Sequence, residues 1–134
     1  MFDGFSFSSD SFVAEFDIKV NGNGVGVSIS STSNNNKFLW LANQIQSQIS
    51  KKVLYYRDSA NAEKGESYNT MNTNTYYHIK MEYSNSELKV YDETGLLSTI
   101  TGLTHYNGDT RSIYFGEWVR NHTVTIKNVL IKPL

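Results

Sequence analysis

Two carboxylates, Glu15 and Asp17, have the spacing best suited to chemistry in this sequence, in the segment FVAEFDIKV at residues 12–20. In a β-strand, residues two apart lie on the same face, so these carboxyl groups would lie close together. A close carboxylate pair is what glycoside hydrolysis needs, with one acid and one nucleophile or base. The alternative, which we favour, is a pair on a solvated strand face.

Other catalytic and metal-binding patterns are missing from the sequence. The chain has no cysteine, which excludes thiolate metal sites, thiol catalysis and disulfides. It also has no G-x-S-x-G element of a serine hydrolase. The histidines lack partners two or four residues away that would suggest a metal site: His78, His105 and His122. We therefore expect no catalytic residues and no cofactor.

Calcium binding through loop oxygens stays open as an alternative, although no spaced carboxylate motif supports it. The residues that could contribute such oxygens are Asp58, Asp92, Asn107 and Asp109. Asp92 and Glu93 also fit the chemistry of a turn, where an Asp side chain bonds to the backbone.

Aromatic and amide side chains dominate the composition. Asn, Ser and Thr make up about three residues in ten, beside nine Tyr, seven Phe and two Trp. Flat rings stack on the apolar faces of sugars, while amides and hydroxyls bind sugar hydroxyl groups. The same composition is also typical of a surface rich in β-turns and β-formers.

Strand parity selects the aromatic residues that point away from a core. Tyr76 and His78 lie opposite the apolar face of residues 77–83, and Tyr114 lies opposite Ile113 and Phe115. Trp118 shares the parity of Tyr114 if the strand continues. The candidate ligand-binding residues are Tyr114, Trp118, Tyr76, His78, Tyr56 and Trp40.

Alternating apolar residues predict the strands that position these side chains. Residues 12–20 alternate over nine positions, which predicts a half-buried strand. The Asn-Gly-Asn-Gly sequence at 21–24 predicts a turn, and residues 25–29 alternate again. We therefore expect 12–20 and 25–29 to form an antiparallel hairpin.

The rest of the chain predicts further short strands and almost no helix. The segments are 37–42, 53–57, 75–83, 87–91, 96–101, 112–118 and 123–131. We expect 43–52 to be an excursion between strands and 58–75 to be the longest loop. Phe2, Phe5 and Phe7 predict pairing of the N-terminal segment with the last strand, and Pro133 is expected beyond that strand. We predict a single β-sandwich domain over residues 1–134.

Charge and hydropathy exclude two classes of partner. The net charge is −1 and the basic residues are scattered, so no stripe matches a phosphate backbone and we expect no nucleic acid. No apolar run approaches the ~20 residues of a membrane span, and we expect no membrane insertion. The N-terminus lacks a signal-peptide pattern, so the sequence does not locate the protein.

Four segments together resemble the concanavalin A-like superfamily of lectins and glucanases, including laminin G-like domains and carbohydrate-binding modules. They are FVAEFDIKV, TYYHIKMEYSNSELKVYDETG, SIYFGEW and TVTIKNVLIKPL. In the second, Tyr76 stands where the family often has Trp, and Tyr91-Asp92 ends the following strand. The resemblance implies a two-sheet antiparallel jelly roll that binds glycans, sometimes with calcium. Related modules occur on phage tails and microbial adhesins.

The resemblance also bears on enzymatic activity. Catalytic members of the family have Glu-x-Asp-x-Glu or Glu-x-Asp-x-x-Glu, but here Lys19 and Val20 stand where the second Glu belongs. We therefore predict a non-catalytic module that binds a neutral glycan or cell-surface polysaccharide, as part of a larger surface or phage tail assembly. The alternative is a structural or protein-interaction β-sandwich that associates with copies of itself without binding glycan.

Overall fold

The computed structural model describes residues 6–7, 11–22, 25–31, 38–46, 49–60, 62–104, 111–117 and 123–134. Side chains are described for 11–22, 51–60, 62–104 and 123–134. The first strands are β1 (Ser6–Phe7), β2 (Phe12–Val20), β3 (Val25–Ser31), β4 (Phe38–Gln46), β5 (Ile49–Arg57) and β6 (Glu63–Thr70). The later strands are β7 (Tyr77–Ser84), β8 (Glu87–Asp92), β9 (Gly95–Ile100), β10 (Arg111–Glu117) and β11 (Val124–Pro133).

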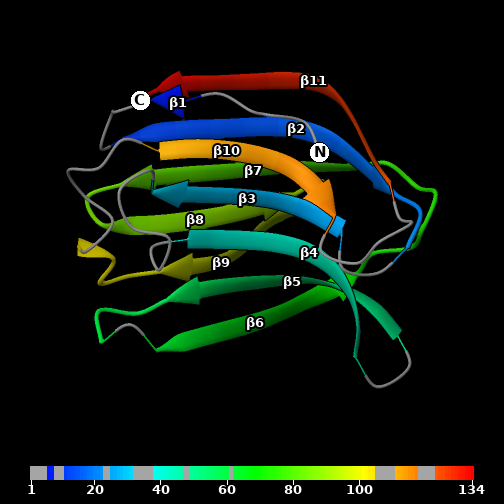
Figure 1. The fold of residues 1–134 in the computed structure, drawn as a ribbon, viewed down its shortest axis with the longest axis horizontal. Coiled ribbons are helices and arrows are strands. Elements are labelled where there is room, and N and C mark those ends of the chain that lie inside the picture. The colour runs from blue at the N-terminus through cyan, green and yellow to red at the C-terminus, as the bar shows by residue number, and fades with distance from the viewer. Residues whose placement is uncertain are drawn as a thin grey trace.

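These strands form two stacked antiparallel sheets (Figure 1). Sheet A has six strands in the order β1-β10-β3-β4-β5-β6, and sheet B has five in the order β11-β2-β7-β8-β9. No α-helix occurs among the described residues, and none of them forms a helix that could span a membrane. The predicted all-β, two-sheet antiparallel sandwich is confirmed.

The core lies between the sheets and follows the predicted alternation. The apolar residues of β2 are buried at every second position from Phe12 to Val20, and Val13 on the opposite face is buried as well. They pack with the buried residues of β7 and β8, and the rings of Phe12 and Tyr83 stack with centroids 5.6 Å apart. The Tyr83 hydroxyl donates to the Leu103 carbonyl at 2.9 Å, which satisfies its polar atom inside the core.

The predicted hairpin between β2 and β3 is wrong. β2 pairs with β11 and β7 in sheet B, whereas β3 pairs with β10 and β4 in sheet A. The chain therefore crosses from one sheet to the other after residue 22. A turn sequence indicates a change of direction, but long-range pairing decides which sheet receives the next strand.

Two segments expected to be irregular are strands. β4 continues to Gln46 and β5 begins at Ile49, so most of 43–52 forms a paired hairpin instead of an excursion. The expected loop 58–75 contains β6, the edge strand of sheet A. Its sequence shows little apolar alternation because most of its residues are exposed and Tyr68 alone packs against the core cluster.

The chain ends pair differently from the prediction. β1 pairs with β10, whereas the last strand, β11, pairs with β2. Phe2 and Phe5 lie outside the described residues. Pro133 belongs to β11, opposite Phe12. An edge strand tolerates this proline because its missing N–H need not serve a neighbour on the open side.

Candidate functional site

The outer face of sheet B brings together Glu15, Asp17 and His78, which sequence analysis treated separately. β2 and β7 are in register so that Asp17 lies opposite His78, while Glu15 lies one row further on. His78 Nδ1 is 2.6 Å from Asp17 Oδ1, and His78 Nε2 is 2.6 Å from Glu15 Oε1. Both ring nitrogens must donate to serve two carboxylates, so this geometry favours the imidazolium form.

The ionisation of this cluster follows from its hydrogen bonds. The bonds to Asp17 and Glu15 raise the pKa of His78 despite partial burial. The Asn128 amide donates to Asp17 Oδ2 at 2.7 Å, and this bond together with that from His78 lowers the pKa of Asp17. The Glu15–Asp17 pair is thus bridged by the His78 ring, and the charged form of Asp17 is favoured.

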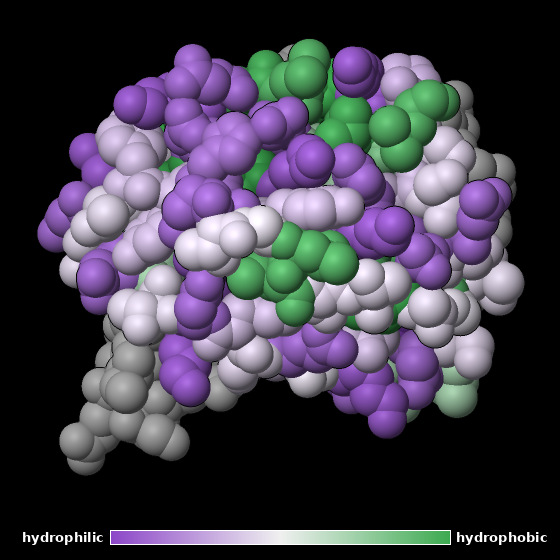
Figure 2. Space-filling view, turned by 180° about the vertical axis from the view of Figure 1, so that it is seen from behind, coloured by the Kyte–Doolittle hydropathy of each residue, from purple (hydrophilic) through white to green (hydrophobic). Residues whose placement is uncertain are grey.

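Tyr76 lies at the corner of the same face, 38% exposed as parity predicted. Two ammonium groups cover its ring: Lys127 Nζ is 4.0 Å and Lys19 Nζ 4.9 Å from the ring centroid. Figure 2 shows that this side of the molecule is mainly hydrophilic, with hydrophobic side chains in separate spots. A sugar that stacked on Tyr76 would have to displace a lysine.

The outer face of sheet A carries a second group of candidates in one cross-strand row. The register places Tyr114 opposite Ser28, Ser28 opposite Trp40, and Trp40 opposite Tyr55. Paired residues in a ladder share a face, so the row lies on a single side of the sheet. The side chains of Tyr114 and Trp40, and all of Trp118, lie outside the described residues.

The burial of Tyr56 shows whether this aromatic row of sheet A faces the core or the outside. Tyr56 is partly buried against the core cluster, and burial raises its pKa. Leu54, two residues from Tyr56, is fully buried in the same cluster. Tyr55 has the opposite parity, so its row faces outward. The predicted candidate Tyr56 therefore faces the interior, and its neighbour Tyr55 takes the outer position.

The ring of Tyr55 lies directly over Gly65 of β6. A Cβ atom at Gly65 would come within 3.1 Å of Tyr55 Cδ1 and Cε1, closer than ordinary packing. A residue without a side chain therefore lets the ring lie close against β6 at the edge of sheet A. Sequence analysis missed this contact because it depends on the pairing of β5 with β6, in a segment expected to be a loop.

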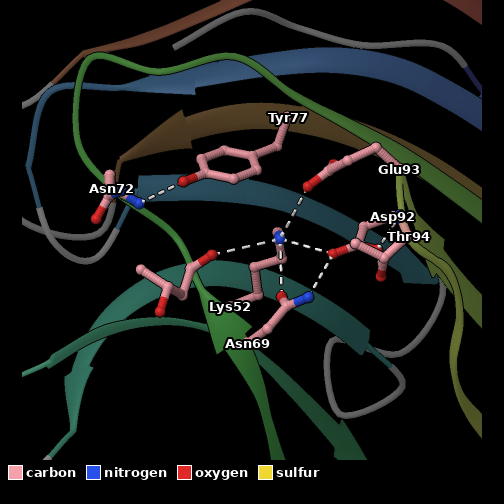
Figure 3. Close-up of polar contacts among 8 residues, drawn as sticks. Lys52, Asn69, Asn72, Tyr77, Asp92, Glu93 and Thr94 are labelled. Carbon is pink, nitrogen blue, oxygen red and sulfur yellow. Dashed lines mark hydrogen bonds and ion pairs between the residues drawn. The ribbon is translucent and has the colours of Figure 1, made fainter.

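A buried polar cluster joins the two sheets near the end of β8 (Figure 3). Lys52 is 1% exposed, and its Nζ is 2.8 Å from Asp92 Oδ2 and 2.8 Å from Asn69 Oδ1. The same ammonium lies 4.3 Å from the centroid of the Tyr77 ring. Lys52 shares the inward parity of Leu54 and Tyr56 and lies where the β5–β6 register shifts between Lys51 and Val53. Sequence analysis missed this position because the strand it predicted began only at residue 53.

The oxygens of Asp92 are fully engaged. Burial alone would raise the pKa of this carboxyl, but bonds from Lys52, Thr94 and Asn69 outweigh burial and lower the pKa far below its usual range. Thr94 N donates to Asp92 Oδ1 at 2.8 Å, which is the turn bonding that the sequence suggested. These contacts make Asp92 an internal ion-pair partner.

The other calcium candidates find no cluster in the described part of the chain. Asp58 Oδ1 accepts bonds from the amides of Ala60 and Ala62, both at 2.9 Å, so it stabilises a turn. Asn107 and Asp109 lie outside the described residues. No group of three or more acidic or histidine side chains suited to a metal occurs among the residues described.

Known structures share this fold at low sequence identity. A functionally unknown protein from Saccharomyces cerevisiae matches with a TM-score of 0.78 and 8% identity, over 98% of this chain and 73% of its own. The carbohydrate-binding module CBM66 from Bacillus subtilis matches with a TM-score of 0.63 and 20% identity, over 98% of this chain and 84% of its own. The PL7 alginate lyase AlyA1 from Zobellia galactanivorans matches with a TM-score of 0.69 and 13% identity, over 97% of this chain and 65% of its own.

These similarities establish the concanavalin A-like jelly-roll fold that the four sequence segments predicted. At such identities they establish the fold alone. The neighbours include both a binding module and polysaccharide lyases. No protein-family model matches the sequence, and the search of curated proteins finds no significant match.

Proposed function

We propose that the protein is a non-catalytic carbohydrate-binding and adhesion module that binds a neutral glycan or cell-surface polysaccharide through the outer face of sheet A. The observation that carries the proposal is the register row of Tyr114, Trp40 and Tyr55, which places three aromatic residues across one face. Strands lie about 4.8 Å apart, so the row spans several sugar-sized steps. We extend the proposal to a setting in a larger surface or phage tail assembly.

The state of the carboxylates supports a role without catalysis. Glu15 and Asp17 are both bound by His78, and hydrogen bonds from Asn128 and His78 lower the pKa of Asp17, so Asp17 is not suited to act as an acid. Retaining and inverting hydrolysis both require one protonated carboxyl group. Cleavage of a polysaccharide by this protein, abolished by Glu15→Gln, would contradict the proposal.

Glycan-array binding with matched tyrosine variants tests the location of the site. We expect Tyr55→Ala and Tyr114→Ala to weaken glycan affinity about tenfold or more, as the loss of a stacking ring in a shallow site implies. Trp118→Ala tests the predicted candidate that follows the last residue of β10, Glu117. Tyr91→Ala is the control, because Tyr91 is half-buried on sheet B with Lys80 Nζ 4.3 Å from its ring centroid.

Tyr76→Ala and His78→Gln test the competing face. The lysines over Tyr76 and the carboxylates on His78 already occupy these groups, so we expect either change to leave neutral-glycan affinity within about twofold. Affinity lost in these variants and retained in Tyr55→Ala would move the site to sheet B.

One observation favours the alternative of self-association. β9 is an edge strand of sheet B with the sequence GLLSTI, which contains no charge and no proline, and Leu96 is 55% exposed. Such an edge can pair with another copy. The other edge of sheet B, β11, carries lysines, Pro133 and a register shift between Lys127 and Leu130.

Light scattering with Leu96→Lys separates the two functions. A stable oligomer that dissociates in Leu96→Lys, in a protein that binds no glycan, would favour the structural role. A protein that binds glycan equally in wild-type and Leu96→Lys forms would favour the binding module.

A further inference from the structure

We propose that Lys19, Lys127 and Tyr76 form a second binding site, on the outer face of sheet B, that takes the carboxylate or sulfate group of an acidic polysaccharide. This site is independent of the neutral-glycan site proposed on sheet A. It rests on two cations that converge on one ring without a carboxylate partner in the described residues.

The neighbouring strands bring these residues together. Lys19 lies on β2 opposite Thr125 of β11, and Lys127 lies opposite Asp17. Ile18 pairs with Tyr77, so Tyr76 comes next to the Lys19 end of that ladder. Three strands therefore contribute to one corner of the face, which fixes the relative positions of the two lysines and the tyrosine.

The bonding of Asp17 explains why Lys127 is left available. Asp17 is the cross-strand neighbour of Lys127 and would be its natural ion-pair partner. His78 already binds Asp17 Oδ1, however, and Asn128 binds Oδ2. Asn128 has a positive φ of 56°, at the register shift of β11, and this bend directs its amide to the carboxylate. The Lys127 ammonium lies over Tyr76 instead.

The local charge favours an anion. Three cations (Lys19, Lys127 and the protonated His78) face two carboxylates, Glu15 and Asp17, and both carboxylates are bound to His78. Two ammonium groups near one ring repel each other, and a bound oxyanion would relieve that repulsion. The exposed part of Tyr76 offers a surface for the sugar that bears the anionic group.

The extent of the site favours a single anionic substituent over an extended anionic membrane. Glu82 and Glu87 lie on the same face, each near a lysine (Lys80 Nζ–Glu82 Oε1 3.1 Å; Lys89 Nζ–Glu87 Oε1 3.9 Å). These neutralised pairs give no broad positive surface for lipid headgroups. Lys19 and Lys127 converge at the Tyr76 corner, whereas Lys132 lies singly at the other end of β11.

Binding of the 134-residue chain to dextran sulfate and alginate, with neutral dextran as reference, tests the site. We expect the double variant Lys19→Gln/Lys127→Gln to lose about tenfold in affinity for both acidic polymers. Lys89→Gln/Lys132→Gln removes the same charge from the same face and should change affinity by less than about twofold. Tyr76→Ala should weaken binding, because the two ammonium groups lose the ring that gathers them.

Three results would overturn the proposal. Equal losses in the two double variants would show a response to net charge alone. Wild-type protein that binds neither acidic polymer has no such site. Binding to phosphatidylserine vesicles but to neither polymer, lost in Lys19→Gln/Lys127→Gln, would assign the cations to a membrane surface. Neutral-glycan binding that depends on Tyr55 is unaffected by any of these outcomes, so the two proposals fail separately.

Discussion

His78 shows how one exposed side chain can hold two strands together. Its imidazolium bonds to both carboxylates of β2 from its own position on β7, so it replaces a repulsive acidic pair by a bridged one. Because the side chain is 44% exposed, water and salt weaken the bridge. Its contribution is therefore expected to be modest and to depend on pH.

His78→Gln should lower the free energy of unfolding by less than about 1 kcal/mol, with a defined pH dependence. The folded-state pKa of His78 is raised above its usual 6.5. The stabilisation is therefore complete below about pH 6.5 and is lost as the pH rises through the raised folded value. Urea denaturation from pH 5.5 to 9 should show the two proteins converging at alkaline pH. A difference that grows with pH would contradict the assignment.

Asp17 adds a contribution at the acid end. Its pKa is lowered from the usual 3.8, so its stabilisation is present above that value and is lost as the pH falls through the lowered folded pKa. The two groups together place the greatest stability of this cluster between about pH 4 and 6.5.

Gly65→Ala tests the proposed glycan site without replacing any of the proposed ligand-binding side chains. The added Cβ lies 3.1 Å from two ring atoms of Tyr55, so the ring must tilt. We expect glycan affinity to fall several-fold while the free energy of unfolding changes by less than about 1 kcal/mol, because Gly65 is an exposed edge position. Ser67→Ala on the same strand is the control. Unchanged affinity in Gly65→Ala would argue against a role for Tyr55.

Sequence patterns anticipate single residues where the strand is regular. The parity of β7 correctly places Tyr76 and His78 on the exposed face and Ile79 and Met81 in the core. It does not reveal the partners of His78, since these depend on the register between β2 and β7. Alternation in β5 also does not show which of Tyr55 and Tyr56 faces outward until the inward position of Leu54 is known.

At the scale of elements, the buried Lys52–Asp92 pair links β5 of sheet A to β8 of sheet B. Asn69 of β6 bonds both members, with Nδ2 donating to Asp92 Oδ2 at 2.8 Å. Taking both charges out of water is costly, and the hydrogen bonds offset that cost. The pair fixes the edge of sheet A that carries Tyr55 and Gly65 against the other sheet.

Lys52→Met should destabilise the protein by about 3–5 kcal/mol, because it leaves the Asp92 carboxylate buried without its cation. Lys51→Met, at the adjacent half-buried position, is the control and should cost less than about 1 kcal/mol. Equilibrium denaturation in urea measures both. Equal effects would mean that the ion pair adds nothing beyond loss of a lysine.

The strands with regular apolar alternation could be predicted from the sequence, and the others could not. Regular alternation identifies β2, β7 and β8, whose buried positions follow the expected faces. β6 escapes detection because an exposed edge strand needs no apolar face. The crossover after β2 escapes detection because the sequence at 21–24 fits a tight hairpin as well as a connection between sheets.

At the scale of the whole molecule, glycan binding should raise the free energy of unfolding. A glycan that binds only the folded state at one hundred times its dissociation constant adds about 2.7 kcal/mol to the free energy of unfolding. For a domain of this size we expect Tm to rise by several degrees. Scanning calorimetry with and without the array-selected glycan measures the shift, and a tenfold loss of affinity in Tyr55→Ala should reduce it to about half at the same glycan concentration. A shift of unchanged size in Tyr55→Ala would place the glycan elsewhere.

The pairing of β2 with β11 also governs how the chain acquires its fold. Residues 12–20 lie between residues 77–83 and residues 124–133, so neither neighbour is close to β2 along the chain. Loop-closure entropy slows such contacts, and topologies of this kind fold in milliseconds to seconds. During synthesis β2 therefore stays unpaired until both of its partner strands, β7 and β11, have left the ribosome.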